Sequence, residues 1–166
     1  MSEHPLLQAD RLLRELLDAR VRFVLIGGLA AQVHGSPSLT GDVDICFALD
    51  RDNLRRLTAA LTSLTAIRRG MPPAVSAPLD DQALRAGNVF TLSTRYGDLD
   101  LLAHPEPGLD FETLLGRSIL AEILGVPVRV AGLDDLMAMK RAAGRPKDRI
   151  ELEILGALRE EIDRRG

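Results

Sequence analysis

The segment Asp42–Phe47 reads DVDICF and places two carboxylates two positions apart in an otherwise apolar run. In a β-strand, residues i and i+2 point to the same face, so Asp42 and Asp44 would lie side by side. Two negative charges at that spacing raise each other's pKa unless a cation holds them, and aspartate is depleted in strands. The pair therefore predicts a site for a hard divalent cation such as Mg²⁺, which prefers carboxylate oxygens.

Upstream of this pair, the apolar run Phe23–Ile26 ends at Gly27 and Gly28. Glycine lets the backbone approach a ligand closely, and successive N–H groups ahead of a helix can bind an anion. The alternative is a strand-to-helix turn without a ligand, which many α/β folds contain. The glycine pair indicates a ligand-binding turn only in combination with the Asp-x-Asp that follows it.

Downstream, the segment Gly97–Leu102 reads GDLDLL and offers two further carboxylates. A third carboxylate on a neighbouring strand would complete a clamp that holds two metal ions for phosphoryl transfer. Asp98 and Asp100 share a face if this segment is a strand. Asp98, beside Gly97, also suits a turn.

This order of residues resembles the nucleotidyltransferase superfamily, whose best-known member is DNA polymerase beta. The C-terminal segments Leu133–Lys140 (LDDLMAMK) and Gly144–Asp148 (GRPKD) sharpen the resemblance. They are similar to the small bacterial members, the minimal nucleotidyltransferases and the AbiEii-type toxins of toxin–antitoxin pairs. The resemblance covers about Val21 to about Leu155, which is nearly the whole chain.

The resemblance implies an enzyme that moves a nucleoside monophosphate from a nucleoside triphosphate to an acceptor hydroxyl with two Mg²⁺ or Mn²⁺ ions. It implies Asp42, Asp44 and Asp100 as the catalytic metal ligands, with Asp100 preferred over Asp98. The residues expected to bind the nucleotide are Gly27, Gly28, Thr40, Lys140, Arg145 and Lys147. The acceptor stays open among tRNA, a protein and a small molecule such as an aminoglycoside, and a cognate antitoxin is a candidate partner.

One position departs from the family pattern, because Ser38 stands where the family often has an arginine. A missing arginine removes one phosphate clamp. The missing clamp favours one alternative, a catalytically silent protein of the same fold that acts as a binding partner.

A further alternative is a metal-dependent phosphatase or phosphodiesterase that uses the same carboxylates with water as the nucleophile. Haloacid-dehalogenase phosphatases also use Asp-x-Asp, but usually with threonine where this chain has Cys46. Sugar-nucleotide glycosyltransferases use it too, but this chain is short for that fold.

The basic residues near the C-terminus have two interpretations. Between residues 137 and 150 they face a single acid, Asp148. They either meet phosphates or form a solvated helix face with local pairs, in which Asp148 would be the partner of Arg145 or Lys140.

Hydrophobic spacing predicts an α/β (α+β) fold, a short mixed sheet flanked by helices with a C-terminal helical segment. The expected helices are 5–19, 29–34, 52–64 and 133 to the end, and the expected strands are 22–26, 42–48, 89–93 and 98–103. Residues 119–130 suit a hairpin, or a helix end plus a strand, and the proline-rich segment 70–78 suits a loop. We expect one domain, with a core over about 21–131 and the helical segment over about 132–166.

Bulk properties exclude several classes of protein. The net charge of −3 over 166 residues argues against a protein that coats nucleic acid. Cys46 is the single cysteine, which excludes an internal disulfide and a multi-cysteine metal site. No apolar stretch reaches the ~18 residues that a membrane span needs. Residues 1–5 lack the basic region of a signal peptide, so we expect a cytoplasmic protein with no membrane partner.

Overall fold

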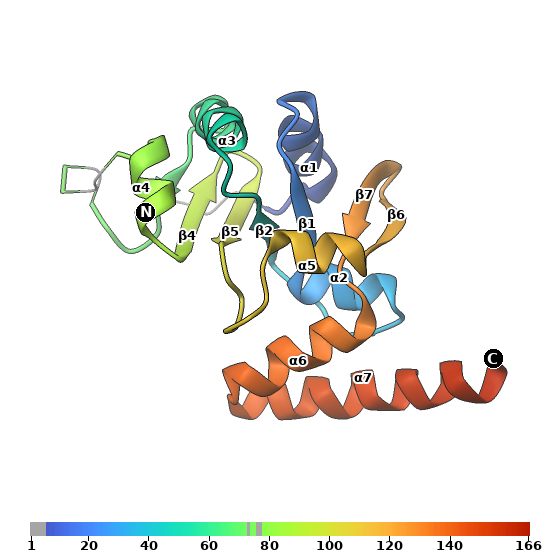
Figure 1. Ribbon diagram of the computed structural model, residues 1–166. Coiled ribbons are helices and arrows are strands. Elements are labelled where there is room, and N and C mark those ends of the chain that lie inside the picture. The colour runs from blue at the N-terminus through green and yellow to red at the C-terminus, as the bar shows by residue number, and fades with distance from the viewer. Residues whose placement is uncertain (1–5, 73, 76–77) are drawn as a thin grey trace.

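A seven-stranded mixed sheet organises the part of the chain that the computed structural model describes, residues 6–72, 74–75 and 78–166 (Figure 1). Its order is β3-β4-β5-β2-β1-β7-β6. The strands are β1 Phe23–Ile26, β2 Asp42–Phe47, β3 Ile67–Arg68, β4 Val89–Thr94, β5 Gly97–Leu102, β6 Ile119–Ile123 and β7 Val126–Val130. The β2–β5 and β1–β7 pairs are parallel, and the other pairs are antiparallel.

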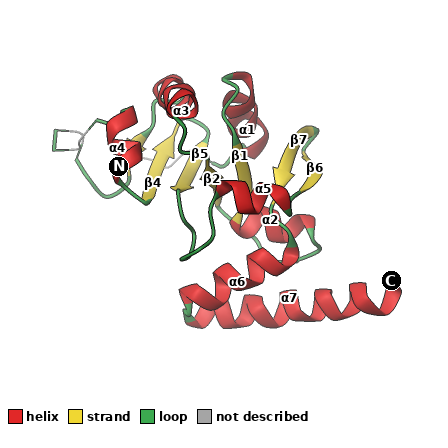
Figure 2. Cartoon of the chain, viewed as in Figure 1, coloured by secondary structure: helices red, strands yellow, loops and turns green. Residues whose placement is uncertain are grey.

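Helices flank the strands on both sides, as Figure 2 shows. They are α1 Ala9–Asp18, α2 Gly27–Val33, α3 Arg51–Ser63, α4 Asp81–Ala86, α5 Phe111–Gly116, α6 Leu133–Ala143 and α7 Pro146–Arg165. In Figure 1, α1, α3 and α4 lie on one side of the strands, whereas α6 and α7 form a helical hairpin on the other. Among the described residues, no helix combines the length and the hydrophobicity that crossing a bilayer requires.

Local sequence signals set where several helices begin and end. Asp50, Asp80 and Asp110 precede α3, α4 and α5, and each carboxylate accepts a hydrogen bond from the backbone N–H three residues further on. Such N-caps satisfy backbone donors that the helix leaves unpaired. Gly144 ends α6 in a left-handed conformation, and Pro146 opens α7, where its missing N–H costs nothing.

The two faces of the sheet differ in character. Val43 and Ile45 of β2 and Leu99 and Leu101 of β5 are fully buried. The intervening positions, which carry the aspartates, are half-buried. Because side chains alternate along a strand, one face packs into an aliphatic core and the other presents carboxylates.

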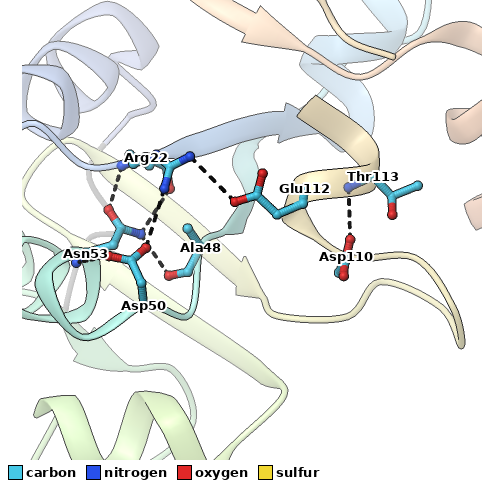
Figure 3. Close-up of polar contacts among 7 residues, drawn as sticks. All are labelled: Arg22, Ala48, Asp50, Asn53, Asp110, Glu112 and Thr113. Carbon is cyan, nitrogen blue, oxygen red and sulfur yellow. Dashed lines mark hydrogen bonds and ion pairs between the residues drawn. The ribbon is translucent and has the colours of Figure 1, made fainter. Parts of the chain in front are cut away.

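A closed polar network fixes the end of β1 and β2 that lies away from these carboxylates (Figure 3). The buried Asn53 accepts a hydrogen bond from Arg22 N at 2.6 Å and donates to Arg22 O at 3.1 Å and to Ala48 O at 2.8 Å. The Arg22 guanidinium lies 3.6 Å from Asp50 and 3.5 Å from Glu112. The network ties the start of β1 to the start of α3 and to the chain that follows β2.

The predicted fold class is confirmed, and the main elements lie close to their expected positions. Residues 119–130 form the hairpin rather than a helix end plus a strand. The predicted helix over 29–34 begins at Gly27, because the glycine pair itself forms the first turn of α2. The first helix begins at Ala9 rather than residue 5, which lies outside the described residues.

Three short elements escaped prediction: β3, α4 and α5. β3 has two residues and the helices have six each. Segments this short do not contain enough residues to show a repeating pattern of hydrophobic positions. The described part of segment 70–78 holds no helix or strand, as expected, and residues 73, 76 and 77 of that prediction lie outside the described residues.

Cys46 is a core residue, as its apolar surroundings indicate. Its thiol is buried and contacts the carbonyl oxygen of Ala103 at 3.5 Å. Burial raises the pKa of this thiol to about 12, so it stays protonated and unreactive.

Candidate active site

The parallel pairing of β2 with β5 brings four carboxylates together. Asp42 lies opposite Asp98, and Asp44 lies opposite Asp100. Carboxylate oxygens of Asp42, Asp44 and Asp100 lie within 4.8 Å of one another. Like charges directly opposite each other destabilise a sheet, so this arrangement requires compensation.

Ionisation of all the carboxylates in the cluster is unfavourable when no metal ion is bound. Burial, together with the charges of Asp42 and Asp100, raises the pKa of Asp44 to about 8. Burial also raises the pKa of Asp100, against the opposing effect of Arg69. Three carboxylate oxygens from two fixed strands form the all-oxygen donor set that Mg²⁺ and Mn²⁺ prefer. The residues present therefore fit a divalent metal.

The glycine pair makes room for this cluster. Ile26, the residue before Gly27, pairs with Asp44 across the sheet. A Cβ on Gly27 would lie 2.1 Å from Asp44 Oδ2, and Gly27 has a φ of +72°. A Cβ on Gly28 would lie 2.7 Å from the Cβ of Thr40. Both glycines are therefore required by the packing of site residues, a role that sequence reasoning did not anticipate.

The loop ahead of β2 orients the first carboxylate. Thr40 Oγ1 contacts Asp42 Oδ1 at 3.2 Å and Asp42 O at 3.3 Å. The carbonyl oxygen of Ser38 accepts a hydrogen bond from Gln32 Nε2 of α2 at 2.8 Å. The loop is thus held by α2, and the Thr40 hydroxyl lies against Asp42.

A cleft of about 520 Å³ opens above the carboxylates, between the sheet, α2 and the α6–α7 hairpin. All the site residues assigned from the sequence line it: Asp42, Asp44, Asp100, Gly27, Gly28, Thr40, Lys140, Arg145 and Lys147. Leu39 and Ile150, which are 96% and 63% exposed, also line the cleft and give it apolar surface. The fold therefore gathers residues that are distant in sequence into one cavity.

The basic residues of the C-terminal hairpin divide into two groups. Asp148 is fully buried and accepts hydrogen bonds from Arg145 Nε at 2.7 Å and Lys140 Nζ at 3.3 Å. Hydrogen bonds from the Arg145 side chain lower the pKa of Asp148 below its usual range, although burial of the carboxylate acts in the opposite direction. Lys147 is exposed, as Arg145 is, but no ion pair joins it to Asp148. The local pairing interpretation is therefore correct for Lys140 and Arg145, although both also line the cleft.

Lys140 influences two carboxylates, Asp44 of the acid cluster on β2 and β5 and Asp148 at the start of α7. Its charge is one of the influences that lower the pKa of Asp44, while its ammonium group contacts Asp148. The lysine therefore links the buried ion pair between α6 and α7 to the acid cluster.

Sequence reasoning missed Arg69. Its Nη1 lies 2.9 Å from Asp98 Oδ2, and its Nη2 contacts Asp100 Oδ1. Asp98 is therefore an ion-paired strand residue rather than a turn residue beside Gly97. The only sequence signal was an arginine pair ahead of the glycine- and proline-rich segment, which carries no periodicity.

No protein-family model and no curated protein sequence matches this chain. Among solved structures, it is similar to ANT(2″)-Ia in complex with adenylyl-2″-tobramycin, with a TM-score of 0.56, 15% identity and coverage of 93% of this chain and 97% of that one. It is also similar to the lincomycin-bound lincosamide antibiotic adenylyltransferase LnuA, with a TM-score of 0.55, 15% identity and coverage of 94% and 99%.

A third similar structure is TM1012 from Thermotoga maritima, assigned provisionally as a nucleotidyltransferase. Its TM-score is 0.55 at 16% identity, and the match covers 97% of this chain and 98% of that one. At such identities the likeness establishes architecture. The chain therefore has the nucleotidyltransferase fold over nearly its whole length.

Proposed function

We propose that this protein transfers a nucleoside monophosphate from a nucleoside triphosphate to an acceptor hydroxyl. The observation that carries the proposal is the placement of Asp42, Asp44 and Asp100 on the floor of the cleft that also receives Lys140 and Lys147. A carboxylate cluster that needs a divalent metal and a cationic wall that suits phosphate are the two parts that phosphoryl transfer requires. The likeness to known nucleotidyltransferases supports the same reaction.

In this proposal the three aspartates hold two Mg²⁺ or Mn²⁺ ions. Such ions, when bound, neutralise the triphosphate and lower the pKa of the acceptor hydroxyl. Thr40 keeps the Asp42 carboxylate in place through its hydroxyl contact. Gly27 and Gly28 leave the space that the Asp44 and Thr40 side chains occupy, so the glycine pair sets the positions of these two side chains in the proposed site.

The C-terminal hairpin completes the proposed site. Lys140, Arg145 and Lys147 place positive charge beside the leaving pyrophosphate, where it stabilises developing negative charge. Leu39 and Ile150 offer apolar surface to the base or the acceptor. None of the described residues that line the cleft is aromatic, so in this proposal the base packs against aliphatic side chains rather than an aromatic ring.

We favour a small hydroxyl-bearing acceptor over RNA. The net charge is −3, and the cationic residues named here lie inside a cleft. One of the similar structures is of a lincosamide antibiotic adenylyltransferase and another is of a complex with adenylyl-2″-tobramycin, which suggests antibiotics as the first acceptors to test. A protein or tRNA acceptor, as in a toxin that a cognate antitoxin restrains, is the competing proposal.

The direct test incubates the protein with each α-³²P-labelled nucleoside triphosphate and Mg²⁺ or Mn²⁺. Three acceptor pools are compared: aminoglycosides and lincosamides, total RNA, and total protein. We expect label in the antibiotic pool, abolished by Asp42→Asn and retained by Glu160→Gln, an exposed carboxylate on α7 outside the cleft. Label in RNA or protein would favour the toxin proposal.

The absence of label in every pool would favour a second candidate, the silent binding partner. Ser38, in the position where the resemblance leads us to expect an arginine, is the observation that favours it. A silent protein would still bind a triphosphate in calorimetry without turning it over. Hydrolysis of the triphosphate by water, with inorganic phosphate or nucleoside monophosphate as a product, would instead indicate the metal-dependent phosphatase or phosphodiesterase alternative.

A further inference from the structure

We propose that Arg69 is a positioning residue that holds the Asp100 carboxylate in place for nucleotidyl transfer, with Asp98 as its anchor. The proposal rests on the function proposed above and adds to it a residue from outside the cleft lining. It also gives a role to Asp98, the fourth carboxylate of the cluster.

The sheet places Arg69 two strands away from the Asp100 carboxylate it contacts, with β4 between them. Arg69 N donates to Thr91 O at 2.9 Å, which extends the β3–β4 ladder by one residue. Thr91 lies opposite Asp100, and Asp100 lies opposite Asp44. Arg69, Thr91, Asp100 and Asp44 therefore form one row across the sheet, and the guanidinium reaches over Thr91 to its targets.

The guanidinium spans two carboxylates with two different nitrogens. Nη1 contacts Asp98 and Nη2 contacts Asp100 Oδ1. Asp98 also contacts Ser93 Oγ at 3.2 Å, so the anchor is held from its other side. The Arg69 side chain is 23% exposed, which limits screening by solvent. Asp100 is thus fixed through Oδ1 on the side of Arg69.

This geometry requires arginine rather than any cation. The planar fork of a guanidinium can contact two carboxylates at once, whereas a lysine ammonium is a compact point charge on a flexible stem. Charge compensation and positioning can therefore be separated by substitution. Arg69→Lys keeps the charge and loses the bridge, and Arg69→Ala loses both.

The first test does not depend on activity. In metal-free buffer, we expect Arg69→Ala to lower the melting temperature by about 4 °C or more, because it leaves two partly buried carboxylates without their shared cation. In an Asp98→Asn/Asp100→Asn background the same substitution should cost less than about half of that shift. Arg56→Ala, which removes an exposed arginine from α3, is the matched control and should leave the melting temperature nearly unchanged. Equal losses in both backgrounds would overturn the proposal.

The second test separates metal binding from turnover. Removing a cation from the cluster should leave the Mn²⁺ Kd, measured by electron paramagnetic resonance, within about threefold of the parent or tighter. The kcat for transfer should fall at least tenfold in Arg69→Ala and in Arg69→Lys, with the triphosphate KM within about threefold, because a displaced ligand affects turnover. Arg69→Lys should nevertheless recover most of the melting temperature.

A parental kcat in Arg69→Lys would show that charge alone suffices and would overturn the positioning role. The failure of the proposed function is a different result. If the proposed function is wrong, the parent protein itself transfers nothing to any acceptor. The melting temperatures of Arg69→Ala in the two backgrounds still decide whether Arg69 holds Asp98 and Asp100.

Discussion

The two ends of the β1–β2 pair handle polar groups in opposite ways. At one end, Asn53 matches its donors and acceptor to the backbone of Arg22 and Ala48, and the Arg22 guanidinium faces two carboxylates (Figure 3). At the other end, four carboxylates lie together, the Arg69 guanidinium contacts only Asp98 and Asp100, and Asp44 has a strongly raised pKa.

The difference separates a region built for stability from one built for chemistry. Buried polar groups that are fully paired make a network rigid, whereas a partly satisfied network costs free energy. Strongly perturbed pKa values cluster at functional sites for this reason.

The largest effect should follow removal of a carboxylate from the acid cluster. We expect Asp42→Asn and Asp44→Asn each to reduce the transfer rate by about a hundredfold or more, equivalent to about 2.7 kcal/mol, because each removes a metal ligand. The free energy of unfolding in metal-free buffer should be unchanged or higher, since repulsion is relieved. Transfer assays and urea denaturation measure the two quantities. If these variants lose stability and keep activity, the acid cluster serves the fold rather than the chemistry.

The opposite pattern should follow disruption of the closed network. Asn53→Ala leaves the Arg22 N–H and the Ala48 carbonyl oxygen without the Asn53 side chain, whereas the Arg22 carbonyl oxygen still accepts a hydrogen bond from Ala48 N at 3.2 Å. We expect a loss of about 2–4 kcal/mol in the free energy of unfolding, from unsatisfied buried groups. Transfer per folded molecule, measured well below the melting temperature, should match the parent. A specific loss of activity would mean that this end also serves the site.

Much of the acid end is predictable from the sequence because its signal is local. The alternation of Asp42 and Asp44 needs only the two-residue period of a strand, and Gly27 stands out by type. Arg69 escapes prediction because it follows a two-residue strand, and its role depends on the β3–β4–β5 register. The pairing of Asp148 is visible in the local sequence, but its complete burial depends on how α6 and α7 pack.

Gly27 tests whether the close packing around Asp44 is required. Gly27→Ala adds a Cβ 2.1 Å from Asp44 Oδ2 at a φ of +72°, so we expect a loss of about 1–3 kcal/mol in stability, along with a fall in transfer. Gly156→Ala is the matched control on α7, where an added Cβ would meet nothing within 4 Å. That change should stabilise the protein by up to about 1 kcal/mol, as expected for alanine in a helix. Thermal unfolding and the transfer assay compare the pair.

The raised pKa of Asp44 makes the metal-free protein sensitive to pH. The ordinary value of 3.8 applies in the unfolded chain, and the folded value is about 8. Between these values the folded state binds more protons, so stability falls as the pH rises from about 4 through 8. We expect Asp44→Asn to exceed the parent by at least about 1.4 kcal/mol at pH 8, the equivalent of one pKa unit, and to match it near pH 4. Chemical denaturation across this range, repeated with Mg²⁺, should show the pH dependence and its relief by metal.

The smallest effect on stability should come from Lys147, which differs from Lys140 in the same C-terminal hairpin. Lys147 is exposed and lines the cleft, whereas Lys140 pairs with the fully buried Asp148. We expect Lys147→Gln to raise the Kd of a non-hydrolysable triphosphate by about tenfold, because hydrogen bonds to charged groups contribute about 1.5–3 kcal/mol. Its stability should change by less than about 0.5 kcal/mol.

Lys140→Gln should weaken triphosphate binding and also lower the melting temperature, since it removes one partner of a buried carboxylate. Calorimetric titration measures the triphosphate affinity of the two variants, and thermal unfolding measures their melting temperatures. If both lysines affect stability alike and leave nucleotide affinity unchanged, the hairpin is structural. The cationic wall of the cleft would then rest on Arg145, whose side chain is 57% exposed although it pairs with Asp148, and whose guanidinium has five N–H donors, more than that pair uses.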